Sequence, residues 1–333
     1  TDRYNANVYH ITKHLFEKKN NIIFHLHTLN LIDFALLVKK NNPCCKIITH
    51  LHCIPWKGFF NSNINHFNKI YEHIYINNQV PPIEYLISNH CEQRAYKEAD
   101  YIVCVTSCAK QFLAHMIGIP DSKIQIINNG ISDTPETIVF TKAPTKEFRL
   151  LYVGSIIPSK GLFYILEAIR KLKEQGYSIS LAVAGKGPQG YVKQLKQVNA
   201  DIPIQFMGNI PFNKLKNYYQ KCNAGIIASL QEQCSYAAIE MSMFGLPLIV
   251  TAVDGLDEMF TDEENALKIA VKFSKVYGLS IDTDNMASQL KRLIDDENLR
   301  NRLGINARKL YKEKFSLNDM VRKTVAIYNK LIN

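Results

Sequence analysis

Apolar runs of strand length alternate with amphipathic helical segments along most of the chain, and this alternation constrains the fold more than any other feature. The runs lie at 21–27, 45–52, 100–107, 123–130, 148–155, 178–185, 204–209, 224–229 and 246–252. Between them, apolar residues recur at helical spacing, for instance Leu162, Ile165, Leu166, Ile169 and Leu172. Strands that are apolar throughout and separated by amphipathic helices are typical of parallel sheets covered on both faces. The pattern therefore predicts an α/β fold.

Two irregular stretches interrupt the alternation. The polar stretch "SDTPETIVFTKAPTKE" at 132–147 contains two prolines and several threonines, which favours a linker. It divides the 333 residues into two βα halves, and a chain of this length suggests two domains. The stretch 54–90 is rich in asparagine and aromatic residues, and we interpret it as a lid or a substrate-facing insertion.

Composition and charge narrow the classes of partner. The formal charge of +10 suits an anionic partner: a nucleotide, a phosphorylated substrate, an anionic membrane surface or nucleic acid. A nucleic-acid binder is disfavoured because the aromatic segment 59–75 has few basic residues. The eight cysteines lack a framework spacing, which fits reduced thiols in a cytoplasmic protein. No run approaches the roughly 18 apolar residues of a membrane span, so association with the inner membrane face would be peripheral.

Loops at the carboxyl ends of the predicted strands carry the candidate site, because ligands of open α/β sheets bind there. Lys160 stands at the start of the helix after 148–155, where exposed N–H groups and a lysine outline a phosphate site. The loop "GKGPQG" after 178–185 has three glycines that let backbone approach a ligand. Both loops alone are weak signals.

The segment "EQCSYAAIE" supplies two carboxylates, Glu232 in a loop and Glu240 in a helix. The amides of Cys234, Ser235 and Tyr236 are predicted to form the first helical turn and to hold a pyrophosphate between the carboxylates. Glu240 lies in an otherwise apolar helix, where an unpaired carboxylate would be costly, and this favours a functional role.

Histidine pairs end two strands of the amino-terminal half, in "HLHT" (25–28) and "THLHC" (49–53). Strand ends are where active-site groups belong. The rival interpretation is a metal site formed by His50, His52, Cys44, Cys45 and Cys53. It is disfavoured because adjacent residues of a strand face opposite ways, so we predict no metal site.

Five ordered motifs resemble the retaining glycosyltransferases of family four. They are "EQRAYKEADYIVCVTSCAKQFL", "KIQIINNGI", "LYVGSIIPSKGLFYILEAI", "VAGKGPQ" and "FMGNIPFNKLKNYYQKCNAGIIASLQEQCSYAAIEMSMFGLPLIVTAVDGLDEMF". The resemblance spans about residues 21–330 and is nearest to a branch found in Bacteroidetes. It implies the GT-B fold, with two Rossmann-like domains facing across a cleft. The two are an acceptor-side domain at 1–140, truncated at its amino end, and a donor-binding domain at 141–318. A helix at 319–333 would cross back to the first domain.

The resemblance also implies a reaction and roles for individual residues. A hexose-type sugar passes from a nucleotide-sugar to an acceptor of unknown identity (cell-surface glycan, lipid or peptide), with retention and without a metal, since no DxD site is evident. Lys160 would hold the diphosphate, Glu232 the sugar hydroxyls and Glu240 the ribose, while His52 would reach the transferred sugar. Further donor-binding residues would be Ser155, Gly185, Lys186, Gly187, Asn209, Ile210, Cys234, Ser235 and Tyr236, and acceptor-side residues would be His27 and Asn129.

The chain departs from the family pattern in two places. Ser155 stands where the family usually has an arginine, and Lys186 is the hypothesised substitute. The family's first strand and glycine-rich loop are missing ahead of "NANVYHITKHLF", which predicts a fragment lacking its first βα unit. Two alternatives stay open at this point: a nucleotide-sugar epimerase of GT-B fold, and a degenerate, non-catalytic nucleotide-sugar binding protein.

Overall fold

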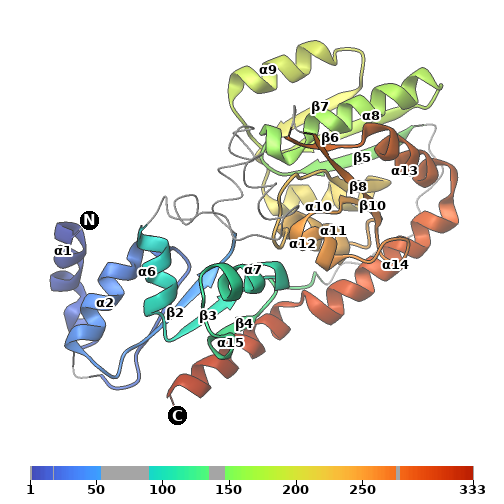
Figure 1. The fold of residues 1–333 in the computed structure, drawn as a ribbon. Coiled ribbons are helices and arrows are strands. Elements are labelled where there is room, and N and C mark those ends of the chain that lie inside the picture. Colours follow the sequence, from blue (N-terminus) through green and yellow to red (C-terminus); the bar gives the residue numbers. More distant parts are fainter. Residues whose placement is uncertain (1, 18, 54–89, 135–146, 275–277, 333) are drawn as a thin grey trace. The chain divides into compact units, whose positions relative to one another are not determined.

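The chain folds into two compact units (Figure 1). The computed structural model describes residues 2–17, 19–53, 90–134, 147–274 and 278–332. Residues 1–58, 69–128 and 319–333 belong to the first unit, and residues 59–68 and 129–318 to the second. The units therefore meet in sequence after Asn128, ahead of the predicted boundary at 140. The predicted insertion lies outside the described residues except for its last residue, and the linker does so from 135 to 146.

The first unit contains a parallel sheet that has four strands among the described residues, in the order β1-β2-β3-β4. The strands are β1 (Ile23–Leu26), β2 (Lys46–Leu51), β3 (Tyr101–Cys104) and β4 (Ile124–Ile126). Its helices are α1 (Asp2–Thr12), α2 (Ile32–Asn41), α6 (His90–Glu98), α7 (Ser107–Gln111), a π-helical turn (Phe112–Met116) and most of α15 (Leu317–Ile332). Short 3-10 turns occupy Lys13–Leu15, Leu29–Leu31 and Asp121–Lys123.

Helices cover both faces of the first sheet. On one face, Ile32 and Ala35 of α2 pack with Leu26 and Ile47 of the strands. On the other face, Ile327 of α15 packs into a separate cluster. Its partners from the sheet are Ile48, Tyr101 and Val103. This double cover explains why the central strands read as continuous apolar runs.

The second unit contains a sheet that has six strands in the described part of the unit, in the order β10-β9-β8-β5-β6-β7, and all its pairs are parallel. The strands are β5 (Phe148–Val153), β6 (Ile179–Ala184), β7 (Ile204–Gly208), β8 (Ala224–Ile227), β9 (Leu248–Thr251) and β10 (Leu267–Ile269). From β5 the chain continues toward β6 and β7, whereas from β8 it continues toward β9 and β10. The strand order therefore reverses between β5 and β8, and in open α/β sheets ligands bind at such a switch point.

Helices flank the second sheet as well. They are α8 (Leu162–Glu174), α9 (Gln189–Val198), α10 (Phe212–Lys221), α11 (Tyr236–Met243), α12 (Asp254–Met259), α13 (Thr283–Asp295) and α14 (Glu297–Lys314), with a 3-10 turn at Pro158–Lys160. Helices α8, α9 and α13 share one large core with the strands. The five apolar residues predicted to form one helical face are all buried in α8.

The nine predicted strands are confirmed, each within its predicted range and usually shorter. Three strands were not predicted: β10 and the antiparallel pair β11 (Val271–Ser274) and β12 (Gly278–Ile281). Each is short and carries polar residues among its apolar ones, so the apolar-run criterion misses it. Among the described residues, no helix is both long and apolar enough to cross a membrane.

Candidate functional site

Lys160 and Glu232 form an ion pair at the switch point of the second sheet. Lys160 ends the 3-10 turn after β5, and Glu232 lies in the loop after β8. The Lys160 Nζ lies 2.5 Å from Glu232 Oε2, and the Ser229 hydroxyl donates to the same oxygen at 3.4 Å. The two side chains keep 28% and 20% of their surface exposed. The sequence prediction placed both residues at one ligand site, and the structure brings them into direct contact.

Glycine allows the loops that carry Lys160 and Glu232 to approach each other closely. Gly161 follows Lys160 with φ +71°, and a Cβ there would lie 1.8 Å from the carbonyl oxygen of Ala228. The Leu230 amide donates to the Ser159 carbonyl at 2.8 Å. The loops after β5 and β8 thus pack backbone against backbone, which only glycine permits at this distance.

The loop after β6 is joined to the loop after β5. Gly185 and Gly187 flank Lys186, whose carbonyl accepts from the Ile156 amide at 2.8 Å. A Cβ on Gly187 would lie 1.9 Å from the Ile156 carbonyl oxygen. The Lys186 side chain is exposed, beside the loop that carries Lys160. The hypothesis that Lys186 replaces the missing arginine is consistent with this position and stays a prediction.

The remaining predicted donor residues lie at the same edge of the sheet. Ser155 is exposed, and its carbonyl accepts from the Tyr152 hydroxyl at 2.7 Å. Burial raises the pKa of Tyr152, so this phenol stays protonated. Asn209 and Ile210 directly follow β7, with Asn209 exposed. The loops after β8, β5, β6 and β7 lie along the edge in this order because their strands are neighbours.

Helix α11 begins later than predicted. Its first residue is Tyr236, and Ser235 is the N-cap, whose Oγ accepts from the Ala238 amide at 3.3 Å. Cys234 and Ser235 therefore precede the first turn, which correspondingly contains the amides of Tyr236 and Ala237. The cause is the serine itself, because an N-cap side chain replaces the missing backbone partner of a first-turn amide.

Asn129 was predicted on the acceptor side, but the structure places it in the second unit. Its side chain is buried and donates from Nδ2 to the Cys234 carbonyl at 2.9 Å. Cys234 is buried as well, and burial raises the pKa of its thiol to about 12. The contact holds the loop that leads into α11, so Asn129 supports the donor side of the predicted site.

Glu240 has a partner that the sequence argument did not provide. The hydroxyl of Tyr219, from α10, donates to Glu240 Oε2. Burial raises the pKa of Glu240, and the hydrogen bond from Tyr219 opposes that shift only in part. Burial also raises the pKa of Tyr219 well above its ordinary value, with the neighbouring carboxylate adding to the effect. The premise of an unpaired carboxylate is therefore wrong, and the position of Glu240 one turn into α11 now carries the argument for a ligand.

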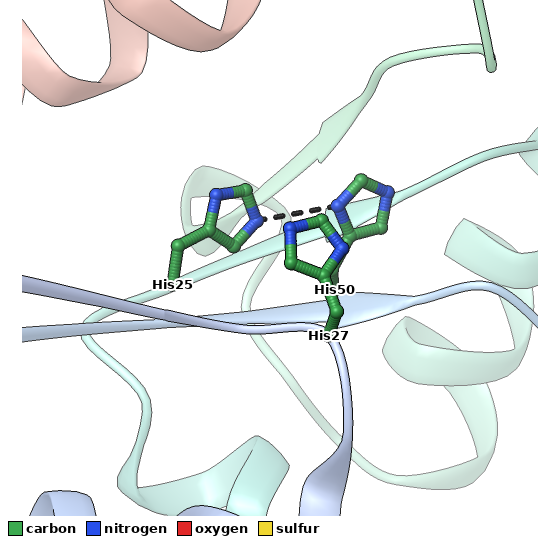
Figure 2. A group of neighbouring side chains, drawn as sticks. All are labelled: His25, His27 and His50. Atoms are coloured by element: carbon green, nitrogen blue, oxygen red, sulfur yellow. Dashed lines mark hydrogen bonds between the residues drawn. The ribbon is translucent and has the colours of Figure 1, made fainter.

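In the first unit, four histidines gather at the carboxyl ends of β1 and β2. Figure 2 shows His25, His27 and His50 with their rings close together. His25 Nε2 lies 3.2 Å from His50 Nδ1, and His27 Nδ1 lies 2.9 Å from His52 Nε2. The rings of His50 and His52 stack with their centroids 4.1 Å apart. His27 and His52, which were predicted separately at neighbouring strand ends, are in contact within a larger cluster.

The register of the parallel strands explains the cluster. Leu26 pairs with Thr49, so the same register continued by one residue puts His27 beside His50. Residues two apart on a strand share a face, which adds His25 and His52 to that face. The H-x-H pattern on two consecutive strands was the available signal for His25, which the predicted site omitted.

Burial favours the uncharged imidazole at three of these histidines, His25, His50 and His52. It lowers the pKa of His25 to about 4 and that of His50 to about 2, with further lowering from the neighbouring histidines. The pKa of His52 is also lowered, first by burial and then by His27. The hydroxyl of Tyr328 in α15 forms a hydrogen bond of 2.7 Å with Nδ1 of His25.

The cysteines of the rival metal interpretation do not join the histidines. Cys45 is buried in a core with Phe16 and Val38, while Cys44 and Cys53 are exposed.

A pocket of about 450 Å³ in the second unit lies away from the candidate site. Its lining includes Glu147, Arg149 and Pro203, which mark the amino ends of the strands.

Family comparisons agree with this arrangement. A family model described as glycosyl transferases group 1 matches residues 133–310, which is more than half of the chain. The chain belongs to this family. A second model, glycosyltransferase family 4, matches residues 2–134. The group 1 match covers the Lys160–Glu232 pair and α11, and the family 4 match covers the histidine cluster. Membership of a Bacteroidetes branch stays a prediction.

Individual relatives of this group 1 chain are distant. An uncharacterized glycosyltransferase of Methanocaldococcus jannaschii is 26% identical over 244 residues, which are 69% of this chain and 60% of the relative. The chain thus spans less than two thirds of that relative's length. A solved glycosyltransferase from Rickettsia africae has a TM-score of 0.70 at 20% identity, covering 99% of this chain and 80% of that one. Anabaena HepE in complex with UDP-glucose has a TM-score of 0.69 at 15% identity, covering 92% and 78%. These structures establish the GT-B fold of the chain.

Proposed function

We propose that the chain is a glycosyltransferase that moves a hexose-type sugar from a nucleotide-sugar donor to an acceptor with retention of anomeric configuration. The observation that carries the proposal is the Lys160–Glu232 pair at the switch point of a group 1 donor sheet. The cation of Lys160 suits the anionic diphosphate of a nucleotide-sugar, and the carboxylate of Glu232 suits the hydroxyl groups of its sugar.

The donor side follows from the charges and amides present. Lys160 and the first-turn amides of α11 would hold the diphosphate, since a helix N-terminus favours an anion. Glu232 would then exchange its lysine partner for sugar hydroxyls, and Glu240 would bind the ribose. The structure of Anabaena HepE with UDP-glucose makes a uracil nucleotide the first donor to try.

The transfer step needs the leaving diphosphate to be stabilised as its negative charge grows. Once Glu232 has exchanged its partner, Lys160 and the α11 amides would act here, since positioned donors stabilise the charge that develops in a transition state. We therefore propose a transfer that needs no metal. His52, which the first unit holds as a neutral imidazole, is the proposed contact to the transferred sugar. The acceptor is a glycan, lipid or peptide, and the net charge of +10 favours work at an anionic membrane surface.

The test is binding and turnover of UDP-, GDP- and ADP-sugars by the wild type, Glu232→Ala and Glu240→Ala, with the exposed Glu264→Ala as control. One nucleotide series should bind. Glu232→Ala should weaken sugar nucleotides by roughly tenfold but not the free nucleoside diphosphate, because it loses charge-assisted hydrogen bonds to the sugar alone. Glu240→Ala should weaken both ligands.

Two results would contradict the proposal. The first is equal affinity of all four proteins for every donor in the panel. The second is conversion of the sugar nucleotide into an isomer without any acceptor, which would identify an epimerase instead.

A further inference from the structure

The histidine cluster of the first unit has no role in the donor chemistry beyond the proposed contact of His52. Three of its members, His25, His27 and His50, have ring nitrogens that all lie within 4.8 Å of one another. We propose that these three histidines form a binding site for one late first-row divalent metal ion, with Zn²⁺ as the reference ion. The proposal goes beyond the transferase function, which needs no metal.

The spacing of the nitrogens is close to what a tetrahedral ion requires. Zn–N bonds of about 2.0–2.1 Å place two ligand nitrogens roughly 3.3 Å apart. His25 Nε2 and His50 Nδ1 are already 3.2 Å apart. The centroids of the three rings form a triangle with sides of 4.5, 4.8 and 5.3 Å. His27 has to turn its ring toward the other two, and its exposed position leaves room for that rotation.

His50 provides an independent observation. Its side chain is 7% exposed, and its Nε2 has no hydrogen-bond partner among the described residues. A buried ring nitrogen without a partner costs free energy, so native proteins rarely leave one. Hydrogen bonds link Tyr328 to His25 Nδ1 and His25 Nε2 to His50 Nδ1, and in either direction of donation they leave His50 Nε2 unmatched. In the orientation drawn in Figure 2, His50 directs Nδ1 at His25, so Nδ1 is the ligand atom that the 3.2 Å spacing describes. A half-turn of the His50 ring would make Nε2 the ligand atom instead, and the ion would then be its partner.

The surrounding contacts resemble those that orient metal-binding histidines. Such a histidine usually engages its second ring nitrogen with a neighbouring group, which fixes the ring and selects the ligand atom. Tyr328 occupies Nδ1 of His25 and leaves Nε2 directed at His50. His52 occupies Nδ1 of His27 and leaves Nε2 of His27 for the ion.

The donor set selects the kind of ion. Imidazole nitrogen binds Zn²⁺, Cu²⁺ or Ni²⁺ well, whereas Mg²⁺ and Ca²⁺ prefer oxygen ligands. Three protein ligands would leave one tetrahedral position for water or another small ligand. We therefore expect Zn²⁺ to bind and Mg²⁺ not to compete.

The experiment is equilibrium dialysis of the chelator-treated 333-residue chain against Zn²⁺, with the bound metal measured, and a parallel titration with Co²⁺ followed by visible absorption. One Zn²⁺ per chain should bind, and Co²⁺ should give the intense bands of a tetrahedral site. His27→Ala and His25→Ala should each weaken binding at least about tenfold, as loss of a ligand does. The exposed histidine variants His14→Ala and His115→Ala are matched controls and should bind as the wild type does.

Further variants keep the test decisive. His50→Ala removes a buried side chain, so its circular dichroism is compared first, and the exposed His27→Ala carries the test if His50→Ala fails to fold. Tyr328→Phe should weaken Zn²⁺ roughly tenfold through loss of the orienting hydroxyl. Less than one Zn²⁺ per chain, equal loss in the His14 control, or equal competition by Mg²⁺ would overturn the proposal. None of these readouts involves a sugar nucleotide, so failure here leaves the transferase proposal untouched.

Discussion

At the carboxyl end of the second sheet, Gly161 and Gly187 bring loop backbones into contact, whereas the same end of the first sheet is filled by four imidazole rings. In the second unit the backbone sets the geometry of the loops, and the proposed ligand contacts come from side chains such as Lys160. In the first unit the same side chains both fill the edge of the sheet and provide the proposed ligand atoms. In the second unit, a substitution should therefore change either the stability of the chain or its ligand binding. In the first unit, one substitution should change both.

The largest effect on the free energy of unfolding is expected at Gly161, where two loop backbones are in contact. Gly161→Ala should lower the free energy of unfolding by at least about 3 kcal/mol, because the added Cβ combines left-handed strain with overpacking. Gly118 is the matched control, since it has a similar φ of +77° but nothing within 4 Å of an added Cβ. Gly118→Ala should cost only about 1 kcal/mol, the strain alone. Urea unfolding measures both, and equal costs would refute the role of the close approach.

In the first unit, His50→Ala should destabilise the chain by about 2 kcal/mol, because truncating a buried side chain leaves a cavity. His27→Ala, from the exposed side of the same cluster, should cost less than about 0.5 kcal/mol. Thermal unfolding without added metal compares the two variants. If both cost the same, the cluster does not help to build this edge.

Tyr219→Phe tests the buried carboxylate of α11. At about pH 7 it should cost roughly 1–2 kcal/mol, because ionised Glu240 loses its donor. Burial raises the pKa of Glu240, and losing the donor raises it further, so the folded variant holds its proton to higher pH than the folded wild type. The cost should therefore grow as pH rises through the pKa of Glu240 and shrink toward about pH 4. Tyr218→Phe, one residue earlier, is the control, and a cost that is independent of pH would contradict the assignment.

The smallest effect on stability is expected at Lys160. Lys160→Met should change the free energy of unfolding by less than about 1 kcal/mol, since partly exposed ion pairs contribute little. Its effect on donor binding should be far larger, roughly tenfold or more in affinity, because a charge-assisted contact to the diphosphate is lost. Urea unfolding and donor titration on the same preparation measure the two effects. A large loss of stability would show that the pair serves the fold.

Much of the fold could be predicted because burial on both faces makes a parallel strand readable as one apolar run. Helix α8 was equally readable, since its core residues recur at helical spacing. The strands β10, β11 and β12 were not, because three or four residues with mixed polarity carry no period. The start of α11 was placed too early, although Ser235 has the residue type that favours an N-cap.

The site was predictable only in part. The residue types and loop positions of Lys160 and Glu232 pointed to the carboxyl end of the sheet, but their contact depends on β5 and β8 being neighbours, which strand order alone decides. The hydrogen bond from Tyr219 to Glu240 joins two residues that lie 21 positions apart in different helices, and no spacing rule predicts it. The histidine cluster required the register of β1 and β2, which the apolar runs of two such short strands do not specify.

If the Lys160–Glu232 pair binds the donor as proposed, it would also select among the anions of the cell. Inorganic phosphate or sulfate can replace Glu232 as the partner of Lys160, but it leaves the carboxylate half-buried beside a new negative charge. A molecule that joins a diphosphate to neighbouring hydroxyls satisfies both groups at once. Under the proposed function, the pair would therefore favour ligands that carry both a diphosphate and hydroxyl groups over simple salts.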